Sequence, residues 1–249
     1  MVDTHCHLDS CKPCDGELVA RARRAGVGRL ATVGMDPDSN QRALVAAREH
    51  EGVVAIVGRH PQHTEGFGEA DVEEIERAAA DPLARAVGET GLDYYRDRAP
   101  RPDQRRAFEA QLELARRARL PVVIHTREAE EDTFAILAEH AAGLTVILHC
   151  FSAPDRLEEA VARGYLCSFA GNVTYRNAEA LQEAARAVPE ELLLVETDSP
   201  YLAPVPVRGK PNEPANVQHT AEFVADLRSV GYAELDAAVE RNAARVFGW

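Results

Sequence analysis

The stretch LPVVIHTREAEEDTFAILAEHAAGLTVILHC, residues 120–150, contains two short apolar runs separated by a segment with helical spacing. The interiors of the runs 120–126 and 144–150 are continuously apolar, which is typical of parallel strands buried on both faces. The segment 130–141 has helical periodicity and is followed by Gly143, and glycine commonly ends a helix. The stretch therefore predicts a strand, a helix and a second strand, in that order.

The same alternation extends over the whole chain. Six further apolar runs have the character of strands: residues 2–8, 28–35, 53–60, 84–90, 164–170 and 192–198. Helical periodicity lies between several of them, over residues 15–26, 38–50, 105–118 and 177–187. Eight strands alternating with helices predict a single domain over residues 1–249 with the (β/α)8 fold of a TIM barrel. The alternative is a doubly wound open sheet. The proline-rich segment 199–214 is expected to be a long loop.

The chain is acidic, with a net charge of −13 from 28 Lys and Arg against 41 Asp and Glu. A domain that binds nucleic acid by neutralising phosphates usually has a basic surplus, so such an activity here depends on a local patch or on bound cations. No apolar run approaches the ~18 residues that a membrane span needs, and no signal sequence is recognisable. We therefore expect a cytoplasmic protein without membrane contact, and a monomer by default.

Residues that can bind metal stand at the C-terminal ends of the predicted strands. His5 and His7 are two residues apart, so that on a strand they project from the same face. In a barrel the C-terminal ends of all strands converge on one mouth, where the active sites of this fold lie. The residues at these ends are His5, His7, His60, Glu89, His125, His149 and Asp198. Their distribution predicts one site assembled from distant parts of the chain.

Four of the histidines and the two carboxylates offer more ligands than one cation takes, which favours two divalent metal ions. A carboxylate can bridge two cations and a neutral imidazole cannot, so Glu89 is the candidate bridge. His5, His7 and Asp198 are then assigned to one ion, and His125 and His149 to the other. Imidazole ligands favour zinc, manganese or iron, whereas Mg²⁺ prefers oxygen ligands but is not excluded.

Two further carboxylates and several cysteines lie close to these positions. Glu196 should share a strand face with Asp198, and either orients a histidine or belongs to a buried ion pair; the same two alternatives apply to Asp3.

Five cysteines are an odd number, which favours a reducing compartment. Cys11 and Cys14 lack the partners of a zinc or redox motif and are expected to be thiols of a surface loop. Cys6 and Cys150 are expected to point away from the mouth.

Four motifs together carry a resemblance to a known family: DTHCHLD (3–9), GETGLDYY (88–95), HCFS (149–152) and ETDSPYLAP (196–204). In their residues and in their order along the chain, these motifs resemble those of the TatD family of metal-dependent hydrolases, often called TatD-type deoxyribonucleases. The match covers essentially the whole chain. The resemblance implies a TIM barrel, a divalent-metal site and hydrolysis of DNA phosphodiesters, commonly as a 3′→5′ exonuclease on single strands. It implies the same ligands: His5, His7, Glu89, His125, His149 and Asp198.

The resemblance also implies that His60 and Arg127 contact the scissile phosphate. Arg127 could instead pair with Glu128 or Glu130 at the surface, and we favour the phosphate. The sequence departs from the family pattern at Arg59, at Ala153 and at Pro211, where a basic residue is frequent. The loss of a basic residue at Pro211 bears on which substrate is bound, while the predicted metal ligands are all present.

A site of this kind lowers the pKa of a bound water and polarises a phosphoryl oxygen. Asp198 is the expected proton acceptor, with Glu89 as the second catalytic carboxylate. Two other classes of function remain open from the sequence. One is hydrolysis of an ester or amide, such as a lactone or an aminoacyl-tRNA ester, which the acidic charge and Pro211 favour. The other is a metal-binding scaffold without catalysis, which the complete ligand set disfavours.

Overall fold

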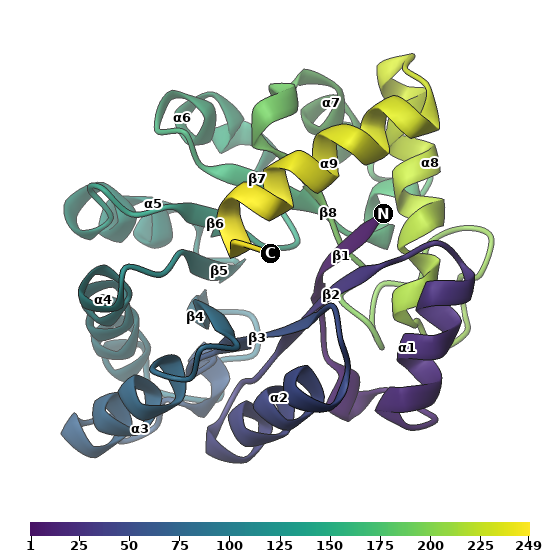
Figure 1. The fold of residues 1–249 in the computed structure, drawn as a ribbon. Coiled ribbons are helices and arrows are strands. Elements are labelled where there is room, and N and C mark those ends of the chain that lie inside the picture. Colours follow the sequence, from purple (N-terminus) through teal and green to yellow (C-terminus); the bar gives the residue numbers. More distant parts are fainter.

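Eight parallel strands form one sheet, in which each strand is hydrogen-bonded to the next along the chain (Figure 1). The computed structural model describes residues 1–249. The strands are β1 (Val2–Cys6), β2 (Arg29–Val33), β3 (Val53–Val57), β4 (Ala84–Asp93), β5 (Val122–Arg127), β6 (Val146–Leu148), β7 (Leu166–Phe169) and β8 (Leu193–Val195). This order confirms the (β/α)8 barrel and excludes the doubly wound sheet, in which the strand order reverses at a switch point.

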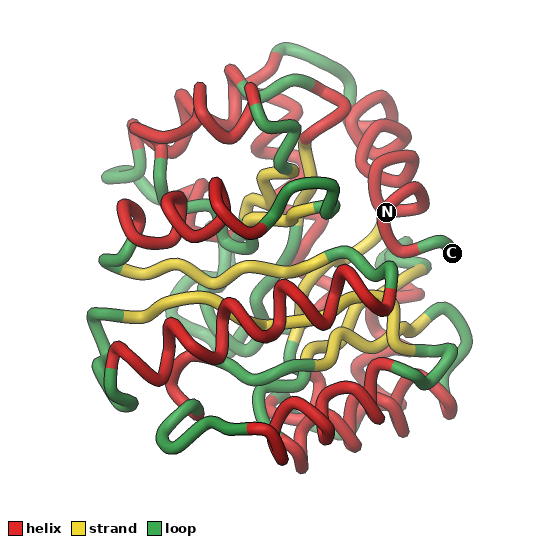
Figure 2. The backbone as a smooth tube through the Cα atoms, turned by 90° about the vertical axis from the view of Figure 1, so that its left-hand side faces the viewer, coloured by secondary structure: helices red, strands yellow, loops and turns green.

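Helices surround the strands on the outside of the barrel (Figure 1). They are α1 (Asp15–Arg24), α2 (Pro37–Glu49), α3 (Glu69–Ala79), α4 (Arg101–Ala118), α5 (Glu130–His140), α6 (Leu157–Ala162), α7 (Glu179–Ala187), α8 (Val217–Arg228) and α9 (Tyr232–Phe247). The last helix, α9, lies across the end of the barrel where the chain begins, and the amino group of Met1 is 3.0 Å from Asp236 of this helix. The opposite end, where the strands finish, is left to the loops (Figure 2).

Beyond the end of β8, the chain completes the ring of strands. The amide of Asp198 donates to the carbonyl of His5 at 2.9 Å, and the amide of His7 donates to the carbonyl of Ser199 at 2.8 Å. A single bridge between Cys6 and Ser199 accompanies these bonds. The closure therefore joins β1 to the segment after β8, and it places Asp198 beside the two histidines that begin the chain.

The observed strands overlap all eight predicted runs but differ at their ends. Most are shorter at the C-terminal end, so that His7, His60, His149 and Asp198 lie in the residues that follow a strand. Only β4 and β5 continue past their predicted ends, to Asp93 and Arg127. All five predicted helices are present, and residues 199–213 form the expected loop.

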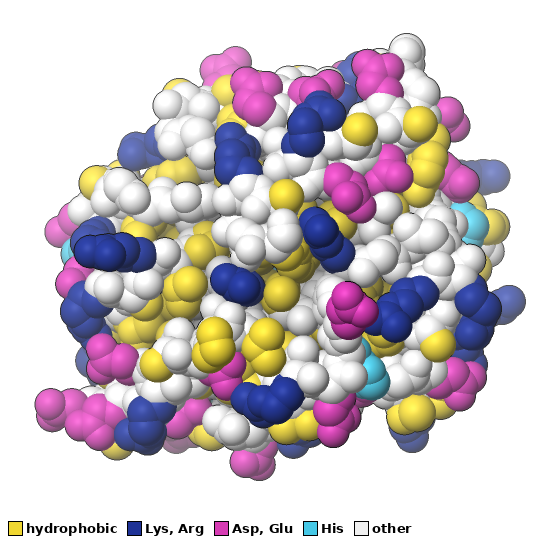
Figure 3. Space-filling view, viewed as in Figure 1, with side chains coloured by type: hydrophobic (Ala, Val, Ile, Leu, Met, Phe, Trp, Pro, Cys, Tyr) yellow, Lys and Arg dark blue, Asp and Glu magenta, His cyan; other side chains and the backbone are white.

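Apolar side chains of the strands and of the inner helix faces form one buried cluster of 67 residues, which extends from Met1 to Phe247. No helix is both long and apolar enough to cross a membrane. Acidic and basic side chains are interspersed on the face that carries α9 (Figure 3). The excess of negative charge therefore forms no single acidic patch on that face.

Candidate metal centre

The carboxylate of Glu89 lies at the centre of the candidate site, inside β4, and is only 2 % exposed. Histidine nitrogens surround it: His125 Nδ1 at 2.7 Å, His149 Nε2 at 3.3 Å, His5 Nε2 at 3.4 Å, His60 Nε2 at 3.6 Å and His7 Nε2 at 3.8 Å. No lysine or arginine nitrogen lies within 4.0 Å of it. Burial alone would raise the pKa of Glu89, but the neighbouring imidazoles, chiefly His149, hold this pKa well below its usual range.

The two histidines of the opening motif meet Asp198 on one side of Glu89. Their Nε2 atoms are 3.3 Å apart, and Asp198 Oδ1 is 3.4 Å from the Nε2 of His7. The Nε2 atoms of His5 and His7 and a Glu89 oxygen lie within 4.8 Å of one another. Ring nitrogens that converge on one another beside carboxylates are the arrangement expected around a shared cation, because each offers a lone pair toward the same point.

The other two predicted ligands lie on the second side of Glu89, and each is contacted by a further carboxylate. His149 Nδ1 is 2.7 Å from Glu196 Oε1, and His125 Nε2 is 3.4 Å from Asp93 Oδ2. Glu196 therefore contacts a histidine, and the same contact is a buried ion pair when His149 is protonated, so both alternatives considered for Glu196 remain compatible with the structure. The same Glu196 oxygen accepts the amide of Cys150 at 2.9 Å, which fixes the backbone beside His149.

A close approach between β4 and β5 holds Glu89 near His125. Gly91 is paired with His125 in the sheet and has a φ of +137°. A Cβ atom at Gly91 would lie 2.0 Å from the carbonyl oxygen of His125, so that only glycine fits here. The GETGLDYY motif therefore contains this glycine for a steric reason, two residues after the central carboxylate.

Asp3 plays neither of the two roles considered from the sequence. Its Oδ1 accepts the amide of Thr197 at 2.8 Å, and its Oδ2 accepts the Thr197 hydroxyl at 2.6 Å. Both expectations, orientation of a histidine and a buried ion pair, were wrong because the chain after β8 turns back toward β1. Asp3 thus anchors the segment that carries Asp198.

His60 differs from the other histidines in the use of its nitrogens. Its Nδ1 accepts the amide of Gln62 at 3.0 Å, so the neutral ring carries its proton on Nε2. Burial lowers the pKa of His60 to about 3, which keeps the ring neutral. His60 is therefore placed as a hydrogen-bond donor that faces the centre, although its distance to Glu89 and His125 alone would also allow it to bind a metal.

A cavity of about 600 Å³ opens above the centre at the barrel mouth. It is lined by Glu89, Asp198 and five histidines: His7, His60, His63, His125 and His149. Arg127 lines it too, and its guanidinium stacks 3.9 Å from the ring centre of Tyr95. No carboxylate oxygen lies within 4.0 Å of Arg127, so the ion pair with Glu128 or Glu130 is absent.

Sequence reasoning missed several residues at or beside the site. Asp93 shares a strand face with Glu89, and the alternation of β4 would have indicated it. Arg96 and Arg98 line the mouth beside Arg127, and no local pattern distinguishes them from the many arginines of the helices. Tyr201 also lines the cavity and is exposed.

Two expectations for the cysteines were wrong. Cys150 lines the cavity, because its φ of +40° ends the alternation of the strand before it. Cys11 is buried, whereas Cys14 is exposed as expected of a surface loop. All five cysteines are free thiols, and none belongs to a group of residues placed to hold a metal.

The donor set fits divalent metal ions. The buried nitrogens and carboxylate oxygens converge at the mouth of a barrel, and they are of the types that zinc, manganese and iron prefer. Fold and site together define the class of metal-dependent hydrolases built on a TIM barrel.

Comparison with known proteins identifies the family. The family model described as TatD related DNase matches residues 2–248. The chain is 41 % identical over 256 residues to the uncharacterized metal-dependent hydrolase YcfH of Escherichia coli, covering 99 % of this chain and 95 % of that protein. It is 36 % identical over 240 residues to the 3′-5′ ssDNA/RNA exonuclease TatD of Erwinia amylovora, covering 93 % of each.

Among solved structures, the TatD homologue YjjV of Escherichia coli superimposes with a TM-score of 0.93 at 29 % identity, covering 100 % of this chain and 98 % of that one. The chain therefore belongs to the TatD family, and it is a metal-dependent hydrolase that acts on ester bonds. This confirms the resemblance seen in the four motifs and sets aside the scaffold without catalysis.

We predict that divalent cations stabilise the metal-stripped protein through Glu89. With Mn²⁺ or Zn²⁺ at 100 times its dissociation constant, the free energy of unfolding should rise by about 2.7 kcal/mol, because the cation binds only the folded state. Glu89→Gln should abolish this rise, measured by thermal or denaturant unfolding with and without cation. Glu158→Gln removes the same charge from an exposed site on α6, and this variant should still show the rise in the free energy of unfolding. An equal rise in Glu89→Gln would contradict the assignment.

Proposed function

We propose that the chain is a deoxyribonuclease that removes nucleotides from the 3′ end of single-stranded DNA. The observation that carries the proposal is the buried Glu89 carboxylate, enclosed by imidazoles and open to the barrel mouth. In this proposal two divalent cations would be held by Glu89 together with His5, His7 and Asp198 on one side and His125 and His149 on the other. The name of the Erwinia amylovora relative, a 3′-5′ ssDNA/RNA exonuclease, supports this choice.

The cations supply an activated water and charge stabilisation at phosphorus. In the reaction, the water oxygen bonds to phosphorus and the bond from phosphorus to the 3′ oxygen of the preceding nucleotide breaks. The proton lost by the water is accepted at Asp198, and the leaving 3′ oxygen takes a proton from solvent water. Asp198 suits this role because its side chain is 13 % exposed and reaches the cavity, whereas that of Glu89 is 3 % exposed.

The neighbouring donors are placed to receive the phosphate. His60 keeps its proton on Nε2, and this nitrogen lies 3.6 Å from a carboxylate oxygen of Glu89. His60 also lines the same cavity. Arg127 lies above, held by its stacking on Tyr95. A neutral imidazole donor and a guanidinium together can bind the oxygens of a phosphodiester as negative charge develops on them.

The charges at the mouth favour an anionic polymer as substrate, although the chain as a whole is acidic. Arginines of the outer helices are commonly paired with carboxylates, as Arg105 is with Glu109 at 2.7 Å. The three arginines that line the mouth, Arg96, Arg98 and Arg127, have no carboxylate within 4.0 Å. They form the local basic patch that a nucleic-acid substrate requires in a protein of net charge −13. An uncharged lactone or ester would have no use for them.

The proposal predicts metal-dependent, stepwise loss of nucleotides from the 3′ end of a single-stranded DNA. Cleavage of a DNA labelled at its 5′ end by the purified protein is measured in the presence of EDTA, Mg²⁺, Mn²⁺ or Zn²⁺. The double variant His125→Ala/His149→Ala should lose at least about 100-fold in rate, because it removes two proposed ligands from one side of Glu89. Absence of cleavage by a protein that binds metal would refute the nuclease and favour an ester or amide substrate.

Arg127→Ala is predicted to weaken binding of single-stranded DNA uniformly across sequences. The slope of log affinity against log salt concentration should fall by about 0.7, because one phosphate contact is lost. Fluorescence anisotropy of a labelled oligonucleotide over a range of salt concentrations measures it. Arg24→Ala, an exposed arginine at the end of α1, removes the same charge away from the mouth and should leave the slope unchanged. Equal slopes for both variants would contradict the assignment of Arg127.

A further inference from the structure

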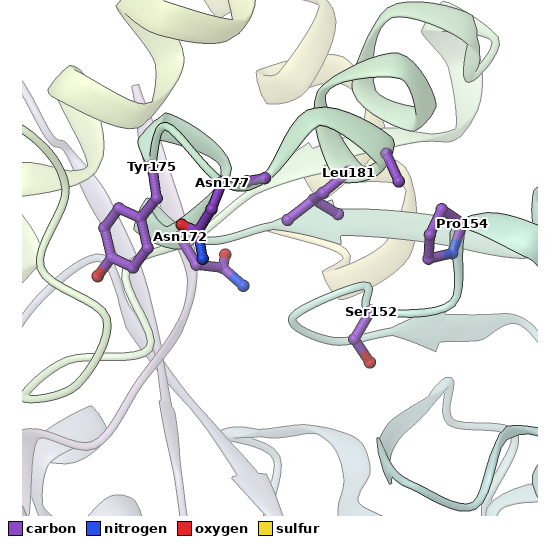
Figure 4. Close-up of a pocket in the computed structure, with 8 residues that line it drawn as sticks. Ser152, Pro154, Asn172, Tyr175, Asn177 and Leu181 are labelled. Atoms are coloured by element: carbon purple, nitrogen blue, oxygen red, sulfur yellow. The ribbon is translucent and has the colours of Figure 1, made fainter.

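A second cavity, of about 330 Å³, lies beside the metal centre between the loops that follow β6 and β7 (Figure 4). Pro154 and Ser152 come from the loop after β6, and Leu181 comes from α7. Asn172 and Tyr175 come from the loop after β7. No charged side chain lines this cavity, in contrast to the arginines and carboxylates of the mouth.

The lining combines apolar surface with free amide groups. Pro154 and Leu181 supply apolar faces, and Asn172 and Asn177 supply carboxamides. The Oδ1 atom of Asn172 is buried and has no hydrogen-bond partner, and its Nδ2 has only a weak contact with Cys150 Sγ at 3.9 Å. A buried amide that lacks partners is costly unless a ligand supplies them.

The walls of this cavity are held in place by the neighbouring loop. A Cβ atom at Gly171 would lie 2.1 Å from the carbonyl oxygen of Leu202, so the two loops are in direct contact. The hydroxyl of Tyr175 donates to the carbonyl of Ala203 at 3.0 Å, and Gln182 donates to the carbonyl of Tyr175 at 2.9 Å. The cavity is therefore formed before a ligand enters, which lowers the entropic cost of binding.

The cavity adjoins the place where the reaction is proposed to occur. Ser152 and Asn172 line both this cavity and the mouth above Glu89. The loop after β6 contains Ser152 and also His149, which contacts Glu89. A ligand whose phosphate lies at the metal centre can thus extend a neighbouring group into the second cavity.

We propose that this cavity binds the base of the 3′-terminal nucleotide of the substrate. The inference rests on the proposed nuclease function and adds to it the position of the strand end. A base has two apolar faces and a polar edge, which match the apolar walls and the carboxamides, because asparagine can both donate to and accept from a base edge. A phosphate does not fit, since no cationic side chain lines the cavity. Arg96 and Arg98 are then left to the phosphates of the preceding nucleotides, while Arg127 faces the phosphate that is cleaved.

Calorimetric binding of small products tests the proposal without catalysis. The probes are the nucleoside 5′-monophosphates dAMP and dCMP and, as the ligand without a base, 2-deoxyribose 5-phosphate, all with the same divalent cation. The protein should bind the nucleotides at least about tenfold more tightly than the sugar phosphate, because stacking and the amide contacts add to phosphate binding. Equal affinities for all three probes would overturn the proposal.

A bulky substitution provides the matched test of location. Ala180 is exposed and lines the cavity, so Ala180→Trp should fill it and reduce the tenfold preference to less than about threefold. Ala187→Trp lies on the same helix, is exposed and is outside the cavity, and it should retain the preference. Asn172→Ala should reduce it as well. An unchanged preference in Ala180→Trp would place the base elsewhere and refute the proposal.

The outcome can be separated from that of the nuclease assay. If DNA is cleaved but the nucleotides bind no better than the sugar phosphate, the nuclease function stands and the base cavity is refuted. If the nucleotides are preferred but no DNA is cleaved under any cation, the cavity stands and the nuclease function fails.

Discussion

A buried carboxylate that lacks a fixed positive partner is the constraint on which this site depends. Glu89 is almost fully removed from water, and the groups that face it are imidazoles, which are neutral unless they gain a proton or bind a cation. Isolated burial of an ionised carboxylate is strongly unfavourable. Positive charge at this point, supplied by protons on the histidines or by divalent cations, is therefore required for the folded site to be stable in its ionised form.

The rest of the barrel serves to bring these groups together. Strand β4 contributes the carboxylate, and Gly91 allows β5 to approach closely enough to place His125 against it. Closure through the segment after β8 brings Asp198 to His5 and His7, and Asp3 anchors that segment through Thr197. Glu196 contacts His149 on the remaining side. Carboxylates outside the proposed ligand set thus contribute to the arrangement at two points, Asp3 and Glu196.

The fold and the convergence of these residues were predictable from the sequence, because alternation of buried strands and helices leaves few topologies open. The four histidines of the proposed ligand set follow from the same reasoning, since each stands at or next to the end of a strand. The role of Asp3 was not predictable, because it depends on how the chain turns after Val195. The position of Cys150 was missed for a similar reason, since its positive φ is not encoded by strand periodicity. The absence of ion pairs at Arg96 and Arg98 was not predictable either, because it depends on which carboxylates the folded chain brings close to them.

Anomalous diffraction from crystals soaked in Mn²⁺ would show whether Glu89 joins two cation sites at the barrel mouth, as proposed. Two anomalous peaks are the result expected from the proposal, one on each side of the Glu89 carboxylate, the first beside His5 and His7 and the second beside His125 and His149. A single peak, or peaks that do not contact Glu89, would contradict it.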